Sequence, residues 1–306
     1  GKAPRMIKIV TDSVASLPAD IAQQENVEVV SLYLNVDGKE YADLDMDVDA
    51  FYERIYEMAD NPPTSSQPSQ AKLESLFESI AKAGDELLGI WISSKLSGAF
   101  EGVLRAARAV ESRNINFSYC MIDSSSCGFD EAFPVLAGIR SVKEGKTLTE
   151  VAHDVVESIK STRFLFTPES LTFLQKGGRI GGAAALLGNL IKLSPVLTVV
   201  DGIPQAMAKV RTQKKALEKI VSIMEEDRAA CGGLKNLVVH YIGEKTPALT
   251  WAREVIEPLL GRAVEVHPVS PVVGLHVGPA VGIAYECAAP LDGKITKDAS
   301  SLAVFS

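Results

Sequence analysis

Three short apolar segments in the first half of the chain each stop at a cluster of Asp, Ser or Thr residues. They cover residues 6–10, 87–92 and 117–122. Segments with helical spacing of apolar residues separate them, for example at 71–83 and 131–143. Buried strands that alternate with helices are typical of a parallel sheet with helices on both faces. We therefore expect an α/β/α domain in the N-terminal half.

The second half has a different pattern, which begins with a short helix expected at 168–176. Segments 196–200 and 203–210 are then joined by Asp-Gly, a pair that suits a tight hairpin turn. A long charged helix is expected from Thr212 to about residue 230, and further short strands follow. These connections predict an α+β domain with a mostly antiparallel sheet. The predicted division is residues 1–163 for the N-terminal domain, 164–290 for the C-terminal domain and 291–306 for a tail.

Composition and charge narrow the classes of function. The chain has 306 residues, enough for two domains, and 46% of them are hydrophobic, so a sizeable core is available. The formal net charge of −8 works against non-specific binding to nucleic acid or to an anionic membrane. No apolar run is long enough to span a bilayer, and no secretory leader is recognisable. We therefore expect a cytoplasmic protein without a transmembrane segment.

Cysteine and histidine spacing predicts no metal site. The four cysteines are scattered and the four histidines are far apart, so we expect reduced thiols and no metal. His153 falls in an expected helix and His240 in an expected strand, where a structural role is usual. His276 lies in a Gly/Pro-rich stretch between strands, and loop residues of this kind contact ligands more often.

Common cofactor and catalytic motifs are absent from the sequence. It contains no Gly-x-x-x-x-Gly-Lys-Ser/Thr loop, and no Gly-x-Gly-x-x-Gly turn follows the first strand. It also lacks the Gly-x-Ser-x-Gly elbow of α/β hydrolases. We therefore expect no cofactor and no hydrolase nucleophile of that type.

Several features allow both a structural and a functional interpretation. The hydroxyl clusters after the strands either cap the following helices or contact a ligand at the carboxyl edge of the sheet. The basic turn at 176–179 either ends a helix or contacts an anion. The apolar stretches 183–193 and 272–283 either line a ligand tunnel or pack in the core. Apolar and polar residues alternate over 27–36, and this segment is expected to form one strand.

Seven motifs occur along the chain in one order. They are Thr11-Asp12-Ser13, Ser65-Ser66-Gln67-Pro68-Ser69, Ser93-Ser94-Lys95-Leu96-Ser97-Gly98, Asp123-Ser124, Lys176-Gly177-Gly178-Arg179-Ile180, Ser194-Pro195-Val196-Leu197 and His276-Val277-Gly278-Pro279. Together they resemble the DegV family of bacterial fatty-acid-binding proteins, also called FakB. The resemblance covers roughly residues 6–287.

This resemblance implies a long-chain fatty acid bound between the two domains. Carried over position by position, the carboxyl contacts are Ser65, Ser97 and His276, with Ser66 and Ser94 as the nearest substitutes. Family members present the bound acid to a separate kinase, which phosphorylates it to an acyl phosphate for phospholipid synthesis.

The resemblance also implies two arginines, Arg179 and Arg211, that help at the transfer of phosphate or at docking to the kinase.

Some details differ from the usual family pattern. Ser65 stands where Thr is usual, and the segment 278–282 is one residue shorter. Ala99-Phe100 replaces the usual Gly-Thr, and the tail after about residue 288 has no counterpart in the pattern.

Three classes of function remain open on the sequence alone. The first is a monomeric lipid carrier without chemistry of its own, for which burial of about 14 methylenes at ~0.8 kcal/mol each can supply tight binding. The second is a hydrolase or phosphotransferase that uses Ser97 with His276, although the sequence supplies no group to orient the histidine. The third is a regulatory protein that senses the lipid.

Overall fold

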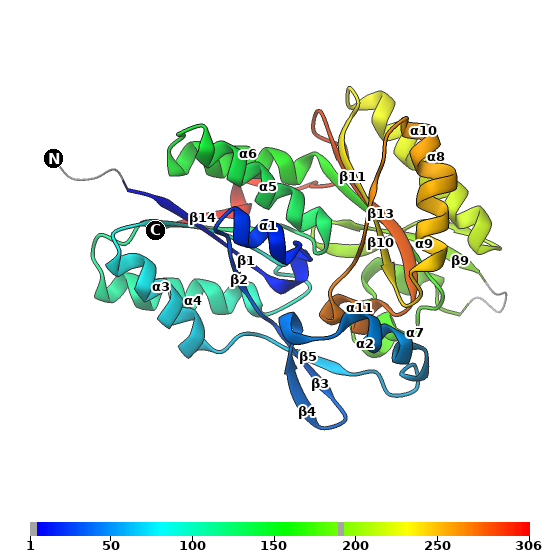
Figure 1. The fold of residues 1–306 in the computed structure, drawn as a ribbon, viewed down its shortest axis with the longest axis horizontal. Coiled ribbons are helices and arrows are strands. Elements are labelled where there is room, and N and C mark those ends of the chain that lie inside the picture. The colour runs from blue at the N-terminus through cyan, green and yellow to red at the C-terminus, as the bar shows by residue number, and fades with distance from the viewer. Residues whose placement is uncertain (1–4, 189–192) are drawn as a thin grey trace.

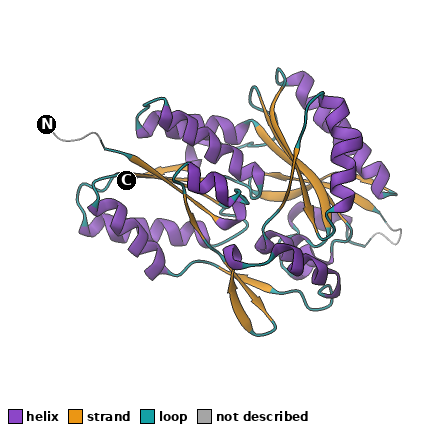
Figure 2. Cartoon of the chain, in the orientation of Figure 1, coloured by secondary structure: helices purple, strands orange, loops and turns teal. Residues whose placement is uncertain are grey.

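A computed structural model describes residues 5–188 and 193–306 of the chain. These residues form three sheets with helices between and around them (Figures 1 and 2). None of the helices in this described part is long and apolar enough to cross a bilayer.

The strands are β1 (Ile7–Asp12), β2 (Glu28–Val30), β3 (Tyr33–Val36), β4 (Lys39–Ala42), β5 (Thr64–Ser66), β6 (Glu86–Trp91), β7 (Tyr119–Asp123), β8 (Thr162–Pro168), β9 (Ser194–Val200), β10 (Ile203–Val210), β11 (Leu234–Ile242), β12 (Glu265–Pro268), β13 (Ala280–Cys287) and β14 (Ala303–Phe305). The helices are α1 (Ala19–Gln24), α2 (Val48–Arg54), α3 (Gln70–Lys82), α4 (Ala99–Arg113), α5 (Phe129–Lys143), α6 (Leu148–Lys160), α7 (Thr172–Lys176), α8 (Gln213–Ala230), α9 (Thr246–Trp251), α10 (Glu257–Leu260) and α11 (Pro271–Val277).

Strands of the first half, joined by β14, build a five-stranded sheet in the order β14-β7-β6-β1-β2. The four strands from the first half are parallel, whereas β14 is antiparallel to β7. Helices α3 and α4 pack on one face and α5 and α6 on the other (Figure 1). Both faces are therefore buried, which explains the continuous apolar runs of the strands. The predicted α/β/α arrangement is confirmed.

Strands of the second half build a six-stranded sheet in the order β10-β9-β8-β13-β11-β12. All neighbours are antiparallel except β11 and β12, so the mostly antiparallel sheet is also confirmed. Helix α8 packs on one face through Ile220 and Ile223. Helix α5 packs on the other through Phe129 and Phe133. Helix α5 thus lies between the two large sheets and contributes to both cores.

Some sequence predictions of local structure are wrong. Pro168 does not begin a helix but ends the buried strand β8, which pairs with β13 over residues 162–168. Residues 27–36 do not form one strand, because β2 pairs with β1 while β3 belongs to a small separate sheet, β4-β3-β5. His276 does not lie in a loop but in the last turn of the short helix α11.

Residues 291–306, to which the sequence assigns no structure, connect the two large sheets. Lys294 is fully buried, and its Nζ donates to Asp130 Oδ1 at 2.9 Å and to the carbonyl of Thr162 at 2.7 Å. The backbone N–H of Asp201, in the β9–β10 turn, donates to the carbonyl of Lys294. The tail ends in β14 at the edge of the N-terminal sheet, so it fastens the C-terminal hairpin to that sheet.

Two carboxyl groups share a buried site at the start of α5. Asp12 and Glu131 are fully or almost fully buried and hydrogen-bond each other. Asp12 also accepts from the N–H of Ile92 at 2.7 Å, and Glu131 accepts from Thr11 Oγ1 at 3.1 Å. Burial raises the pKa of Asp12 to about 6, and burial with the nearby Asp12 charge raises the pKa of Glu131 well above its ordinary range. The pair therefore holds a proton near neutral pH.

Replacing Glu131 with glutamine should stabilise the protein more and more as the pH rises. The amide N–H donates to Asp12 permanently, so no proton has to be taken from solvent. In the natural protein the folded state binds more protons than the unfolded state above about pH 4, so its unfolding free energy falls as the pH rises. We expect a difference of about 1–3 kcal/mol at about pH 8. Urea unfolding of both proteins across this range measures it, and a difference independent of pH contradicts the shared proton.

Candidate functional site

An apolar pocket lies between the two large sheets. It encloses about 840 Å³, including the space at its open mouth. Its walls come from β8, β11, β13 and α11 of the second half and from the segments that follow β1 and β6 in the first. Most of the lining is aliphatic or aromatic, with a few polar side chains among it. This combination is typical of a site for a small organic ligand.

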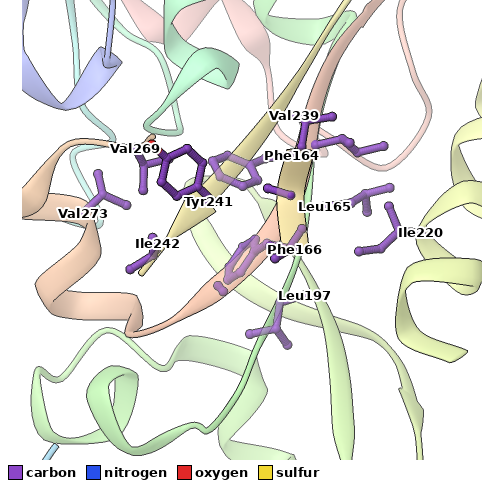
Figure 3. Packing of buried hydrophobic residues seen from close by; sticks show 14 of the residues in the cluster. Phe164, Leu165, Phe166, Leu197, Ile220, Val239, Tyr241, Ile242, Val269 and Val273 are labelled. Atoms are coloured by element: carbon purple, nitrogen blue, oxygen red, sulfur yellow. The ribbon is translucent and has the colours of Figure 1, made fainter. Parts of the chain in front are cut away.

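Alternation along β8 decides which side chains form the pocket wall. Figure 3 shows Phe164 and Phe166 on the side of the sheet that faces Val273, whereas Leu165 points toward Ile220 of α8. Successive side chains of a strand point to opposite faces of the sheet. One face of the C-terminal sheet therefore packs against α8, and the part of the other face that α5 leaves uncovered lines the pocket.

One of the two apolar stretches predicted as a tunnel wall contributes to the pocket. The lining residues from 272–283 are Val272, Val273, His276, Val277, Ala280, Val281 and Gly282. In the other stretch, the described residues 183–188 and 193 do not line it, and Ala183 packs in the core instead. Residues 189–192 lie outside the described part of the chain.

Four polar side chains of the lining, which we call its polar region, are linked in a chain of neighbours: Ser65, Ser97, Arg179 and His276. Ser65 contacts His276, and the charge of Arg179 acts on His276. Arg179 also binds the carbonyl of Leu96, the residue before Ser97. The small sheet places Ser65, because β5 pairs with β3 through Ser65 and Leu34. Helix α11 places His276, whose Nε2 lies 2.8 Å from Ser65 Oγ. Side chains that are 211 positions apart in the sequence are therefore in hydrogen-bond contact.

His276 is a neutral group in this site. Burial, together with the nearby charge of Arg179, lowers the pKa of His276 to about 3. Its Nδ1 is buried and has no hydrogen-bond partner within the described residues. Because a buried N–H without an acceptor is costly, we assign the hydrogen to Nε2, which then donates to Ser65 Oγ. The hydroxyl hydrogen of Ser65 remains free to donate to a ligand.

Ser97 and Arg179 complete the polar region. Ser97 Oγ accepts from the N–H of Ala99 at 3.1 Å, at the start of α4, and its own hydrogen has no acceptor among the residues that the structure describes. Arg179 donates to the carbonyl oxygens of Leu96 at 3.2 Å and Gly177 at 2.7 Å. These bonds hold the guanidinium at the pocket without neutralising it, and burial lowers the pKa of Arg179. Two hydroxyls, a neutral imidazole and a cation are suited to a carboxylate.

Comparison with known proteins identifies the family. A family model for DegV proteins, described only as uncharacterised, matches residues 6–287. The chain belongs to the DegV family. The resemblance carried by the seven sequence motifs is confirmed, and residues 288–306 extend beyond the matched DegV region.

Sequence relatives and solved structures both match this chain over nearly its whole length. A DegV domain-containing protein of Clostridium perfringens is 37% identical over 280 residues, which are 91% of this chain and 98% of that protein. A DegV family protein of Thermus thermophilus, described as binding fatty acid, matches with a TM-score of 0.81 at 29% identity over 92% of this chain and 99% of that one. DegV of Bacillus subtilis, described as a fatty acid binding protein, has a TM-score of 0.81 at 26% identity over 93% and 100%.

The other residues carried over from the DegV pattern do not line the pocket. Ser94 Oγ donates to Asp123 Oδ2 at 2.6 Å and stabilises the loop after β6. Ser66 Oγ is buried without a hydrogen-bond partner in the described residues and does not line the pocket. Arg211 is exposed just after β10. Of the five predicted hydroxyl or imidazole contacts, the structure brings Ser65, Ser97 and His276 together.

Some lining residues carry no signal in the sequence. His240 accepts from the N–H of Phe129 at 3.1 Å, and its Nδ1 lies 2.8 Å from the carbonyl of His267. Both ring nitrogens are therefore occupied, and the ring stacks against Phe164 as part of the wall. Cys127 also lines the pocket. Within residues 5–188 and 193–306, no group of three His, Cys, Asp or Glu side chains could hold a metal ion.

Proposed function

We propose that this protein binds one long-chain fatty acid in the pocket and presents the carboxyl group to a separate kinase in the cytoplasm. The kinase forms the acyl phosphate used in lipid metabolism, and this protein contributes binding without a cofactor or chemistry of its own. The observation that carries the proposal is the apolar pocket whose few polar lining residues include the Ser65–His276 pair, Ser97 and Arg179.

The apolar lining supports an acyl chain as the ligand. A chain of about 14 methylenes gains roughly 11 kcal/mol on burial, at ~0.8 kcal/mol each. Loss of translational freedom and ordering of the chain oppose binding by several kcal/mol. The tail thus supplies the affinity, and the polar region has only to keep the carboxylate hydrogen-bonded. The relatives from Thermus thermophilus and Bacillus subtilis, described as binding fatty acids, agree with this ligand class.

The Ser65–His276 pair also resembles part of a catalytic triad, and its environment argues against that role. A triad histidine needs a partner on Nδ1 to orient it and to stabilise the imidazolium. Nδ1 of His276 has no such partner in the described residues, and a pKa of about 3 makes it a weak base. His276 also contacts Ser65 rather than Ser97, the nucleophile that the sequence suggested.

Purified protein should carry a fatty acid in near-stoichiometric amount. Organic extraction followed by mass spectrometry identifies the lipid, and a fatty acid kinase with ATP should convert it to the acyl phosphate only when this protein is present. A pocket that is consistently empty, and that cannot be loaded with added fatty acid, would falsify the proposal. Formation of the acyl phosphate by this protein without a kinase would instead support the alternative that the protein is itself a phosphotransferase.

Removing the Ser65 hydroxyl should weaken binding of the fatty acid. Hydrogen bonds to charged groups contribute about 1.5–3 kcal/mol, so we expect Ser65→Ala to raise Kd by roughly 10- to 100-fold. Displacement of a fluorescent fatty acid measures the change. Ser79→Ala is the matched control, because Ser79 is an exposed serine of α3 far from the pocket lining. If the two variants bind the fatty acid with equal affinity, Ser65 does not contact the carboxylate.

A further inference from the structure

The polar region of the pocket joins two segments that are remote in the chain, so something must hold them in register. Ser65 belongs to the small sheet near the N-terminus, and His276 belongs to α11 near the C-terminus. We propose, on the basis of the function proposed above, that Asp43 and Tyr52 are positioning residues for the carboxyl site. They fix the first turn of α11 so that His276 meets Ser65.

Asp43 contacts the first turn of α11 directly. It is 4% exposed, and its Oδ1 accepts from the backbone N–H of Val272 at 3.2 Å. The hydroxyl groups of Ser13 and Ser270 lie next to the same carboxyl group. The backbone N–H of Asp43 donates to the carbonyl of Leu32, next to the first residue of β3. One buried residue therefore connects α11, through its side chain, to the base of the small sheet, through its backbone.

Tyr52 fixes the backbone just before α11. This side chain is 1% exposed, and its hydroxyl donates to the carbonyl of Val269 at 2.5 Å, with the carbonyl of Ser270 at 3.2 Å. The phenol also lies close against Gly274, where a Cβ would come within 2.6 Å of the Tyr52 oxygen. Helix α2, which carries Tyr52, therefore packs closely on α11.

Helix α11 depends on such contacts because its own sequence favours helix weakly. It has seven residues, Pro-Val-Val-Gly-Leu-His-Val, of which three are β-branched valines and one is glycine. β-Branched residues and glycine have low helix propensity, and helices this short are not stable alone. Tertiary contacts must therefore set where α11 lies.

Val272, which is bound by Asp43, and His276, which contacts Ser65, are about one helical turn apart. Val272, which donates to Asp43, precedes His276 by four positions, a rise of about 6 Å along the helix. If the hydrogen bond between Val272 and Asp43 is lost, the first turn of α11 can shift, and His276 shifts with it. Hydrogen bonds weaken steeply once donor and acceptor separate beyond about 3.5 Å. A small movement of α11 is enough to break the contact of His276 with Ser65.

This role predicts a change in recognition of the head group and not of the acyl chain. Tyr52→Phe removes the hydroxyl that donates to the carbonyl of Val269, and Asp43→Leu removes the oxygen that accepts from the N–H of Val272, each with little change in side-chain size. We call these two the clamp variants. Binding is measured for a long-chain fatty acid and for the fatty alcohol of equal length, which buries the same tail without a carboxylate. We expect the preference for the acid to fall at least about 5-fold in each variant, the loss of one hydrogen bond, while the affinity for the alcohol changes less than about 2-fold.

Tyr285→Phe is the matched control for the loss of a buried phenol hydroxyl. Tyr285 is fully buried in β13 and donates to Asp227, and neither residue lines the pocket. This variant should keep the acid-to-alcohol ratio of the natural protein. NMR titration of the His276 imidazole gives a second readout without ligand, because loosening of α11 should raise the pKa of His276 from about 3 toward its ordinary value.

The outcomes separate this inference from the proposed function. If the natural protein prefers the acid and both clamp variants keep its ratio and its His276 titration, the positioning role is wrong and the function stands. If the clamp variants lose affinity for acid and alcohol equally, their effect is general destabilisation and the positioning role is again wrong. If the natural protein binds neither ligand, both proposals fail. Should Tyr52→Phe not fold, the comparison rests on Asp43→Leu alone.

Discussion

Lys294→Ala should lower the free energy of unfolding by about 3–5 kcal/mol, because it leaves a buried carboxylate without its cation. Lys294 and Asp130 are 1% and 0% exposed and lie 2.9 Å apart. The same ammonium group donates to the carbonyl groups of Ile159 and Thr162, where α6 ends and β8 begins. Urea unfolding followed by circular dichroism measures the loss.

Two further variants show whether the unpaired charge is the cause. Lys297→Ala removes an exposed lysine three positions along the same tail and should leave stability almost unchanged. Asp130→Asn combined with Lys294→Met removes both charges, so the double variant should regain a large part of the loss. A loss below about 1 kcal/mol for Lys294→Ala would show that the pair contributes little.

Ala280→Trp should abolish fatty acid binding by filling the pocket. Ala280 is 5% exposed at the start of β13 and lines the pocket. If the indole displaces about four methylenes of the acyl chain, the loss is ~3 kcal/mol, or more than about 100-fold in Kd. Extraction and mass spectrometry should find the purified variant without lipid, and the fluorescent displacement assay should show the loss of affinity.

The matched control adds the same side chain to an exposed position. Ala206 lies on β10 and does not line the pocket, so Ala206→Trp should retain the lipid. The melting temperatures of both variants establish that each is folded, since overpacking costs about 1–3 kcal/mol where space is lacking. If Ala280→Trp still carries a full equivalent of fatty acid, the lipid binds elsewhere.

The architecture of the N-terminal domain was predictable because its central strands are buried on both faces and therefore appear in the sequence as continuous apolar runs. The runs at 6–10, 87–92 and 117–122 are apolar on both faces, as a parallel sheet covered by helices requires. The hairpin around Asp201-Gly202 was equally clear, since the left-handed conformation of both turn residues favours this pair. In these places the local sequence preference and the tertiary structure agree.

Elements that depend on distant partners were not predictable. Helix α11 contains glycine and β-branched residues, and the contacts that stabilise it come from Asp43 and Tyr52 more than 200 positions away. Strand β8 pairs with β13, more than 100 positions away, and the local sequence predicts a helix from Pro168 instead of the end of this strand. Strand β14 has three residues and forms only because the edge of β7 is there to pair with it.

The candidate site was predictable only in part for the same reason. The motif resemblance pointed to Ser65, Ser97 and His276, and the structure brings these three to one pocket. It could not choose between Ser65 and Ser66, because adjacent residues of a strand point to opposite faces and the register of β5 is set by β3. The roles of Asp43 and Lys294 left no sequence signal, since a single buried charge looks like any surface charge until its partner is known.

The pairing of β14 with β7 matters for how this protein is produced. A version shortened to the region shared with its relatives would lose Ala303–Phe305 and leave the backbone N–H and carbonyl groups of β7 open along that edge. Unpaired edges recruit strands from other molecules. Such a version is expected to aggregate during expression, and an affinity tag is better attached at the other end of the chain.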